Sequence, residues 1–249
     1  MIYILFKEIK MPRFFCINKE NDRFYLDKED SKHIIKSLRM KEGDNITICD
    51  KNGYDYECEL IIDSENVQGK IISKKENDTE PNVKITLYQA LPKSDKFETI
   101  VQKTVELGIY EIVPIMTNRC ISRPDKKSMK KKIERYNKIA FEAAKQSGRG
   151  IIPRVRDMIT FKEAIKEIKD FDMKILFYEN GGENLKDFKY ENLNDIAFIV
   201  GSEGGFDALE AKYAKENEVT LMGLGKRILR CETAPIAALS ALMLLTDNM

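Results

Sequence analysis

The spacing of apolar residues changes near Pro81, and this change restricts the fold more than any other feature of the chain. Before it, short β-rich segments are separated by turn signals such as Asn52-Gly53, which is typical of a hairpin. After it, apolar strands alternate with amphipathic helices, which is the pattern of a mostly parallel α/β sheet. We therefore predict a small β-barrel over residues 1–80 and an α/β domain over residues 81–249, with the polar stretch 74–82 as their linker.

The predicted elements are placed by hydrophobic period and by turn and capping residues. In the first domain they are strands at 23–26, 45–49, 55–62 and 67–73, and a helix at 31–40 with Ser31 as its N-cap. In the second they are strands at 83–90, 110–116, 173–177, 196–200 and 220–222, and helices at 93–107, 125–147, 160–168, 207–216 and 233–245. The last helix is apolar on nearly every side, so we expect it to be buried in the core or against another subunit.

Scarce residue types exclude several kinds of chemistry. The chain of 249 residues has one histidine, His33, and five cysteines, none of them spaced as C-x-x-C. These counts argue against a zinc or redox centre and against a Ser-His-Asp triad, so we predict no metal and give these six side chains structural roles. No apolar run reaches the ~20 residues that span a bilayer, and no signal-peptide pattern is present. We therefore predict a cytoplasmic protein without a membrane partner.

Positive charge is concentrated in one segment. The formal net charge is only +1, but residues 118–156 hold thirteen basic and three acidic side chains. Residues 1–80 are mildly acidic, with 14 basic and 17 acidic side chains. So dense a basic block is a candidate surface for phosphates, and the alternative is a solvated helix face.

A glycine-rich segment, FIVGSEGGF at 198–206, follows a predicted strand and leads into a helix. Glycines let a ligand approach the backbone closely. The spacing is neither GxGxxG nor a P-loop. The carboxylate of Glu203 disfavours a phosphate ligand and suits a positively charged one. The alternative is an ordinary strand-to-helix turn.

Two further segments carry polar groups in loops. The first, MGLGKRILRCETAP at 222–235, offers Arg227 and Arg230 to bind phosphate or to stabilise a developing negative charge. The second, EAAKQSGRG at 142–150, ends a predicted helix at Gly148. Its hydrogen-bonding side chains are those of Gln146, Ser147 and Arg149. The alternatives are a structural loop and an ordinary helix C-cap.

Taken together, these segments resemble the RsmE-type uridine-N3 methyltransferases of ribosomal RNA, which belong to the SPOUT superfamily. The resemblance runs in order from Met11 to the C-terminus, and its most specific motifs are GSEGGF at 201–206 and LGKRILRCETA at 224–234. It also rests on MPRFF at 11–15, on 33–40 with its Leu38-Arg39, on QALPK at 89–93, on KTVELG at 103–108 and on QSGR at 146–149. Ser202 departs from the family's usual proline. Residues 1–10 precede the family's usual start and are interpreted as an upstream extension without a function.

The resemblance implies a fold, a cofactor and an assembly. The fold is a PUA-like barrel that binds RNA, followed by a SPOUT α/β domain with a deep trefoil knot and a homodimer interface. The cofactor is S-adenosylmethionine, held by loops at 176–179, 201–205 and 222–229. The implied cofactor-binding residues are Leu176, Phe177, Tyr178, Gly201, Glu203, Gly204, Met222, Leu224, Gly225, Ile228 and Leu229.

The implied activity is methylation of N3 of a uridine in 16S rRNA, U1498 in the conventional rRNA numbering, within the small ribosomal subunit. As a hypothesis, Arg230 stabilises the anionic uridine, and Glu203 or Glu232 orients groups or takes the proton. The predicted RNA-binding residues are Arg13, Arg39, Lys93, Arg119, Arg123, Gln146, Ser147, Arg149 and Arg227.

Other functions stay open on the sequence. One alternative is a SPOUT methyltransferase that acts on another RNA base, and a second is a non-catalytic RNA-binding protein. An NAD-dependent enzyme of the Rossmann type is a distant third. Its glycine fingerprint would follow the first strand of the domain, where this chain has Leu91-Pro92-Lys93 instead.

Overall fold

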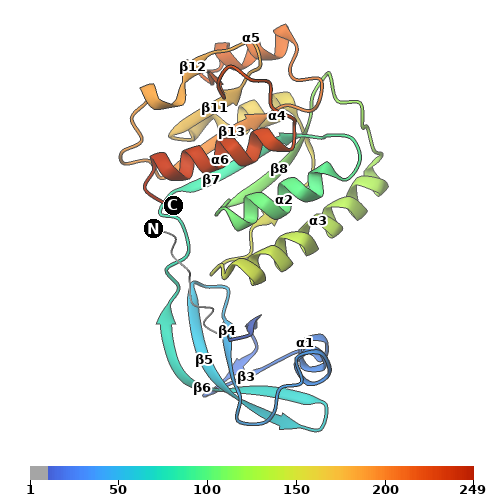
Figure 1. Ribbon diagram of the computed structural model, residues 1–249. Coiled ribbons are helices and arrows are strands. Elements are labelled where there is room, and N and C mark those ends of the chain that lie inside the picture. The colour runs from blue at the N-terminus through green and yellow to red at the C-terminus, as the bar shows by residue number, and fades with distance from the viewer. Residues whose placement is uncertain (1–10) are drawn as a thin grey trace. The chain divides into compact units, whose positions relative to one another are not determined.

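Residues 11–80 fold mainly into strands and residues 81–249 into alternating strands and helices in the computed structural model (Figure 1). The structure describes residues 11–249, so the interpretation of 1–10 as an extension lies outside the described residues. The chain divides into two units after Glu80, but the segment Lys145–Ile152 returns to the first unit. That segment is predicted to belong to the second domain, so its place in the first unit differs from the prediction.

The first unit is built on a six-stranded sheet in the order β1-β4-β5-β6-β3-β2. Neighbouring strands are antiparallel, except that β1 runs parallel to β4. The strands are β1 (Arg13–Phe15), β2 (Lys19–Glu20), β3 (Arg23–Tyr25), β4 (Asn45–Cys49), β5 (Tyr54–Asp63) and β6 (Asn66–Glu76). The predicted hairpin at Asn52-Gly53 joins β4 to β5. The predicted linker 74–82 is wrong at its start, because residues 74–76 pair with β5 as the end of β6.

One short helix covers this sheet. Helix α1 (Lys28–Lys32) continues as a wider π-helical turn at His33–Leu38. The N-cap is Asp27, whose side chain accepts a hydrogen bond from the backbone N–H of Asp30 at 2.8 Å. The predicted cap at Ser31 is wrong, because that residue lies inside the helix, where its hydroxyl accepts a hydrogen bond from β6.

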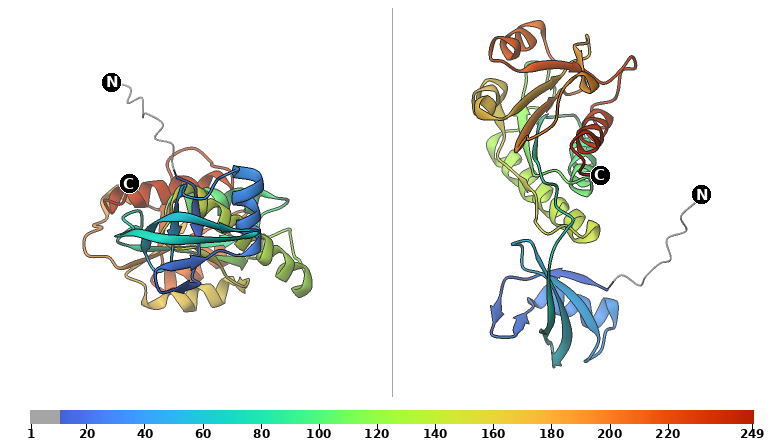
Figure 2. Two further views of the ribbon diagram at one scale, coloured as in Figure 1. Left: turned by 90° about the horizontal axis from the view of Figure 1, so that it is seen from below. Right: turned by 90° about the vertical axis from the view of Figure 1, so that its left-hand side faces the viewer.

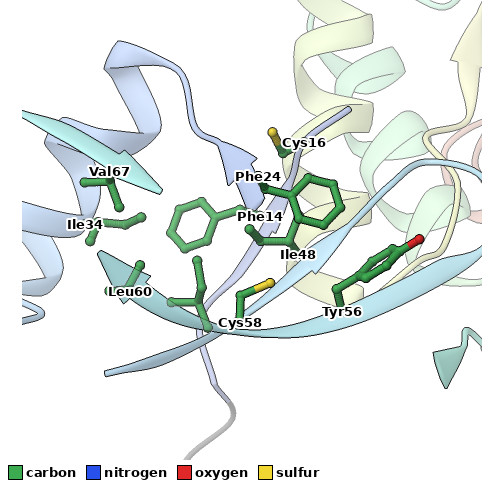
Figure 3. Close-up of a cluster of buried hydrophobic side chains, with 10 residues drawn as sticks. Phe14, Cys16, Phe24, Ile34, Ile48, Tyr56, Cys58, Leu60 and Val67 are labelled. Atoms are coloured by element: carbon green, nitrogen blue, oxygen red, sulfur yellow. The ribbon is translucent and has the colours of Figure 1, made fainter. Parts of the chain in front are cut away.

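The core of the first unit is aromatic and aliphatic (Figure 3). Phe14 of β1 and Phe24 of β3 lie among Ile48 and Leu60 of the neighbouring strands. Gly69 lets β6 close over this core, because a Cβ at that position would come within 2.7 Å of the Ile48 side chain. The full cluster is Phe14, Cys16, Phe24, Ile34, Ile46, Ile48, Tyr56, Cys58, Leu60 and Val67.

The second unit contains a sheet in the order β10-β8-β7-β13-β11-β14-β12, with β9 paired to β8. Every pairing in it is parallel, as the α/β pattern predicts. The strands are β7 (Lys84–Ala90), β8 (Glu111–Met116), β9 (Arg154–Val155), β10 (Ile159–Thr160), β11 (Met173–Phe177), β12 (Glu183–Asn184), β13 (Asp195–Val200) and β14 (Thr220–Gly223).

Helices connect these strands and cover both faces of the sheet (Figure 2). They are α2 (Lys96–Glu106), α3 (Lys126–Ser147, whose last residues belong to the first unit), α4 (Phe161–Glu167), α5 (Ala208–Glu216) and α6 (Thr233–Leu245). The apolar helix α6 lies beside α2 and against β7, with α4 on the opposite face of the sheet. This confirms its predicted burial, although Leu244 near its end is 66% exposed. None of the helices between residues 11 and 249 is long and apolar enough to cross a bilayer.

The sheet order brings three loops together. β13, β11 and β14 are neighbours, and their pairing aligns Phe177 with Val200 on one side and with Met222 on the other. Because parallel strands end at the same edge of a sheet, the segments that follow β11, β13 and β14 meet there. These are the three loops that the sequence analysis assigns to a cofactor.

Candidate active site

The three loops enclose a cavity of about 530 Å³ in the second unit. This volume lies in the range of small-molecule and cofactor sites. The lining residues are Lys96, Phe177, Tyr178, Glu179, Gly181, Val200, Gly201, Ser202, Glu203, Gly204, Gly205, Gly223, Leu224, Gly225, Lys226, Arg227, Ile228, Leu229, Arg230, Cys231 and Ala234. Predicted loops from three separate parts of the chain therefore form one site.

The glycine-rich loop after β13 is a tight turn that passes close to its neighbours. The backbone N–H of Gly205 donates to the carbonyl of Ser202 at 3.0 Å. Gly205 has a φ of +62°, and a side chain there would collide with the Glu179 carboxylate. A Cβ on Gly201 would come within 3.0 Å of the Gly205 backbone. Glycine is needed here for backbone conformation and for close approach.

Arg119 fastens two of these loops to each other. Its guanidinium donates to the carbonyl of Gly204 at 3.0 Å and lies 3.6 Å from the Glu179 carboxylate. The side chain is about half exposed. This residue is predicted to bind RNA, and the structure adds a role in holding the cofactor loops in place.

A charged cluster forms one wall of the cavity. The Lys96 ammonium donates to the Glu203 carboxylate at 2.9 Å and lies 3.5 Å from the Glu232 carboxylate. The backbone N–H of Lys93 donates to both oxygens of Glu203, at 3.2 and 3.3 Å. The Cys231 thiol donates to Glu232 at 3.2 Å. One cation is therefore shared by two carboxylates that come from different loops.

These contacts set the protonation states of the cluster. Partial burial raises the pKa of Glu203 and of Glu232, but other contacts outweigh it, and both pKa values lie below the usual range. At Glu203 these are hydrogen bonds from Lys96 and from backbone N–H groups, and at Glu232 they are hydrogen bonds from a backbone N–H and the Cys231 thiol together with the charge of Lys96. The hydrogen bond to Glu203 raises the pKa of Lys96. Burial raises the pKa of the Cys231 thiol to about 12. At neutral pH the cluster thus holds two carboxylates, one ammonium and a neutral thiol.

The loop between β14 and α6 presents side chains outward. Arg227 and Arg230 are exposed, and Ile228 is 90% exposed. The backbone carbonyl of Arg230 accepts hydrogen bonds from the first turn of α6 at 2.9 Å. Its guanidinium has no hydrogen-bond or ion-pair partner among residues 11–249, so it is available to a ligand at the cavity.

Most of the predicted cofactor residues line the cavity. The exceptions are Leu176 and Met222, which are fully buried within β11 and β14 behind it. Of the predicted catalytic residues, Glu203 and Arg230 line the cavity, and Glu232 reaches it through Lys96. Lys96 is not among the site residues predicted from the sequence. The signal that marks it is its place at the start of α2, directly after the loop that ends the first strand of the unit.

The predicted RNA-binding residues fall in both units. Lys93, Arg119, Arg123 and Arg227 belong to the second, and Arg13, Arg39, Gln146, Ser147 and Arg149 to the first. Arg123 donates to the backbone carbonyls of the 117–118 turn, and Arg39 and Gln146 are exposed. Arg13 and Arg149 are enclosed in a hydrogen-bond network and are not presented on the surface.

That network ties the segment Lys145–Ile152 to the strands of the first unit. Arg149, 3% exposed at its side chain, pairs with Glu80 at 2.7 Å. The same carboxylate accepts hydrogen bonds from the backbone N–H groups of Gly150 and Ile151. Arg13 pairs with a β5 aspartate at 2.6 Å and donates to the Arg149 carbonyl at 2.9 Å. Buried charges are retained because each is paired.

Ser202 gives a first testable result. It is 7% exposed, and its hydroxyl oxygen has no hydrogen-bond partner among the described residues. Burial of an unpartnered polar group costs about 1–3 kcal/mol. We therefore expect Ser202→Ala to raise the free energy of unfolding by about 1 kcal/mol, measured by chemical denaturation followed by circular dichroism. A fall of similar size would mean that the hydroxyl has a partner.

The residues around the cavity fit S-adenosylmethionine. Carboxylates at Glu179 and Glu203 suit a ligand with a sulfonium cation, and Leu224 and Leu229 supply apolar surface for a ring. Glycine at 201 and 205 leaves the backbone open to close approach. In residues 11–249, no group of three or more histidine, cysteine or carboxylate side chains is placed to hold a metal ion.

Known proteins share this arrangement over nearly the whole chain. A family model described as an RNA methyltransferase domain matches residues 79–243, and one described as an RNA methyltransferase PUA domain matches residues 26–72. Ribosomal RNA small subunit methyltransferase E of Bacillus subtilis is 35% identical over 237 residues, which cover 92% of this chain and 93% of that protein.

Solved structures agree with these matches. Ribosomal RNA small subunit methyltransferase E from Neisseria gonorrhoeae, bound to S-adenosyl methionine, is 32% identical with a TM-score of 0.86, covering 94% of this chain and 98% of that one. A methyltransferase from Legionella pneumophila in complex with the cofactor SAM is 29% identical with a TM-score of 0.85, covering 94% and 97%. The chain therefore belongs to the ribosomal RNA small subunit methyltransferase E family of S-adenosylmethionine-dependent RNA methyltransferases.

Proposed function

We propose that this protein methylates N3 of a uridine in 16S rRNA of the small ribosomal subunit, at U1498 in the conventional numbering, with S-adenosylmethionine as methyl donor. The observation that carries the proposal is the cavity at the ends of β11, β13 and β14, which is lined by carboxylates, by glycines and by Arg230. The family supplies the class of reaction. The exposed lysines of α3 indicate that the substrate is a polyanion such as RNA.

Each part of the cavity has a role in this proposal. The backbone of the glycine-rich loop and the apolar Leu224 and Leu229 hold the cofactor, and Glu179 and Glu203 favour its positive charge. S-adenosylmethionine supplies an activated methyl group there. Arg230 stabilises the negative charge that develops on the uridine ring as N3 loses its proton. Holding nucleotide and cofactor in one orientation supplies much of the rate.

Binding of the cofactor separates an enzyme from a non-catalytic RNA-binding protein. Isothermal calorimetry with S-adenosylmethionine is expected to show one site per chain. Because a ligand that binds only the folded state stabilises it, the cofactor is also expected to raise the melting temperature. If saturating cofactor produces neither heat nor a thermal shift, the alternative of a non-catalytic RNA-binding protein is favoured.

The RNA surface is proposed from the basic side chains that remain unpaired. Of the thirteen between 118 and 156, six have a hydrogen-bond or ion-pair partner: Arg119, Arg123, Arg135, Lys145, Arg149 and Arg156. The other seven have none within the described chain: Lys126, Lys127, Lys130, Lys131, Lys132, Lys138 and Arg154. Five of these lysines lie in the first two turns of α3, where the helix dipole and like charges four residues apart are unfavourable. Binding of an anionic partner such as RNA offsets both the unfavourable helix dipole and the repulsion between these lysines.

Salt dependence tests this surface. Replacing Lys126, Lys127, Lys130 and Lys131 with alanine keeps α3 helical and removes four cations. Because each phosphate contact contributes ~0.7–0.9 to the slope of log affinity against log salt, the slope is expected to fall by about 3. The matched control replaces Lys162, Lys166, Lys212 and Lys215 on α4 and α5, with the same loss of charge. An equal slope for both variants would place the RNA elsewhere.

Assembly and topology extend the proposal. We propose a homodimer, because exposed apolar side chains at Ile228 and Leu244 suit cover by a second copy. A deep trefoil knot in the second unit is proposed from the family resemblance. A cytoplasmic location is proposed because the proposed substrate is ribosomal RNA. Sedimentation velocity checks the first of these, with a mass near twice 28.8 kDa expected.

A further inference from the structure

Lys96 is placed rigidly at the wall of the cavity. It is the first residue of α2, and the side chains that follow it, Phe97, Ile100 and Val101, are fully buried and fix the helix on the sheet. Its own side chain is 32% exposed and lines the cavity. The ammonium is therefore held by a fixed backbone and remains accessible to a ligand.

Lys96 and Glu203 keep hydrogen-bonding capacity for a ligand. A carboxylate offers about four acceptor positions and an ammonium three donors. Glu203 accepts from Lys96 and from the Lys93 backbone, and its side chain is 28% exposed. The Lys96 ammonium lies 2.9 Å from Glu203, 3.5 Å from Glu232 and 3.7 Å from the Cys231 sulfur. Only the first contact is short, so a ligand beside the open acceptor positions of Glu203 can replace one of the two longer contacts.

This pair matches the reactive edge of a uracil ring. N3–H of uracil is a donor, and the carbonyl oxygens on either side of it are acceptors. Cytosine has the opposite order at the same place, with an acceptor at N3 and an amino donor beside it. A carboxylate next to an ammonium therefore pairs with uracil. With cytosine, the carboxylate would face the N3 acceptor and the ammonium would face the amino donor.

We propose that Glu203 accepts a hydrogen bond from N3–H of the target uridine while Lys96 donates to the adjacent carbonyl oxygen, so that the pair selects uridine and prepares N3 for methylation. This inference rests on the proposed function and adds the group that reads the base. Lys96 thereby becomes a catalytic residue that the sequence analysis does not select.

The same contacts help the proton leave N3. As the N3–H bond breaks, its proton passes to the Glu203 carboxylate and the electron pair stays on N3. That pair forms the bond to the methyl carbon, and the pair of the broken carbon–sulfur bond stays on sulfur. Glu203 is a weak base because its pKa lies below the usual range. Lys96 compensates, because a cation on the ring carbonyl stabilises the anion and makes N3–H more acidic.

Lys96→Met tests the proposal, since it keeps the length of the side chain and removes the donor. Single-turnover methyl transfer is measured with saturating S-adenosylmethionine on an rRNA fragment, alongside calorimetry with the cofactor alone. We expect cofactor affinity within about twofold of wild type and a rate at neutral pH about 100-fold lower. The rate of the variant is expected to recover at alkaline pH, where N3 ionises without help. Lys96→Arg, which keeps a donor, is expected to retain most of the activity.

Base selection gives a second readout. Wild type is expected to prefer uridine RNA to RNA with cytidine at the target position. This preference is expected to be smaller in Lys96→Met, where Glu203 alone still distinguishes the two bases. Lys212→Met on α5 is the control and is expected to match wild type. If Lys96→Met keeps wild-type rates and preference, or loses cofactor binding as strongly as activity, the inference is wrong. If wild type itself methylates no uridine, the proposed function fails and the inference fails with it.

Discussion

Replacing Glu80 with glutamine is expected to lower the free energy of unfolding by about 3 kcal/mol, because it removes the carboxylate that pairs with the buried Arg149 guanidinium at 2.7 Å. Loss of one member of a buried ion pair costs ~3–5 kcal/mol, and the lower end applies here because the Glu80 side chain is 21% exposed. The carboxylate also holds the backbone N–H groups of Gly150 and Ile151. Urea denaturation followed by circular dichroism measures the change.

A control variant and a double variant test whether the loss of stability comes from the Glu80–Arg149 ion pair. Glu76→Gln removes the same charge at an exposed position on β6, and a change within about 0.5 kcal/mol is expected. Combining Glu80→Gln with Arg149→Met removes both charges, so part of the stability is expected to return. If Glu80→Gln unfolds like wild type, the ion pair does not hold the segment Lys145–Ile152 to the first unit.

Arg230→Ala is expected to lower the single-turnover rate of methyl transfer about 100- to 1000-fold at saturating cofactor and RNA. This is the usual cost of removing one group that stabilises charge developing in a transition state. Cofactor affinity is expected to change little, because the proposed role of Arg230 is to contact the uridine and not the cofactor. Rapid-quench assays with labelled S-adenosylmethionine give the rate, and calorimetry gives the affinity.

Lys215→Ala, an exposed cation on α5, is the control for this variant and is expected to react at the wild-type rate. An Arg230→Ala rate within a few-fold of wild type would remove Arg230 from the chemistry. A parallel loss of rate and of cofactor affinity would instead assign it to cofactor binding.

Local patterns predict most of the elements. The long helix predicted at 125–147 is observed as Lys126–Ser147, and the strand predicted at 173–177 has the same bounds. Both succeed because hydrophobic period and capping act over a few residues. The return of Lys145–Ile152 to the first unit depends on the pairing of Arg149 with Glu80, which is 69 residues away. No local pattern contains that information.

The site likewise contains residues that local sequence patterns predict and residues that only distant contacts bring into place. The glycine-rich loop and Glu203 can be predicted because a strand, glycines and a carboxylate in sequence indicate a cation-binding turn. The place of Lys96 depends on parallel pairing that brings the start of α2 to the end of β13. Arg13 and Arg149 are predicted from the sequence to bind RNA. The structure shows that both charges are already paired with carboxylates inside the first unit, which the sequence does not reveal.

The most direct test of the account is to map methylated nucleotides in small-subunit rRNA after incubation with the purified protein and S-adenosylmethionine. Small subunits from a strain that lacks the activity are the substrate, and the digested RNA is read by mass spectrometry. We expect one new 3-methyluridine, at U1498, that depends on both protein and cofactor. Methylation of another base, or of no nucleotide although the cofactor binds, would contradict it.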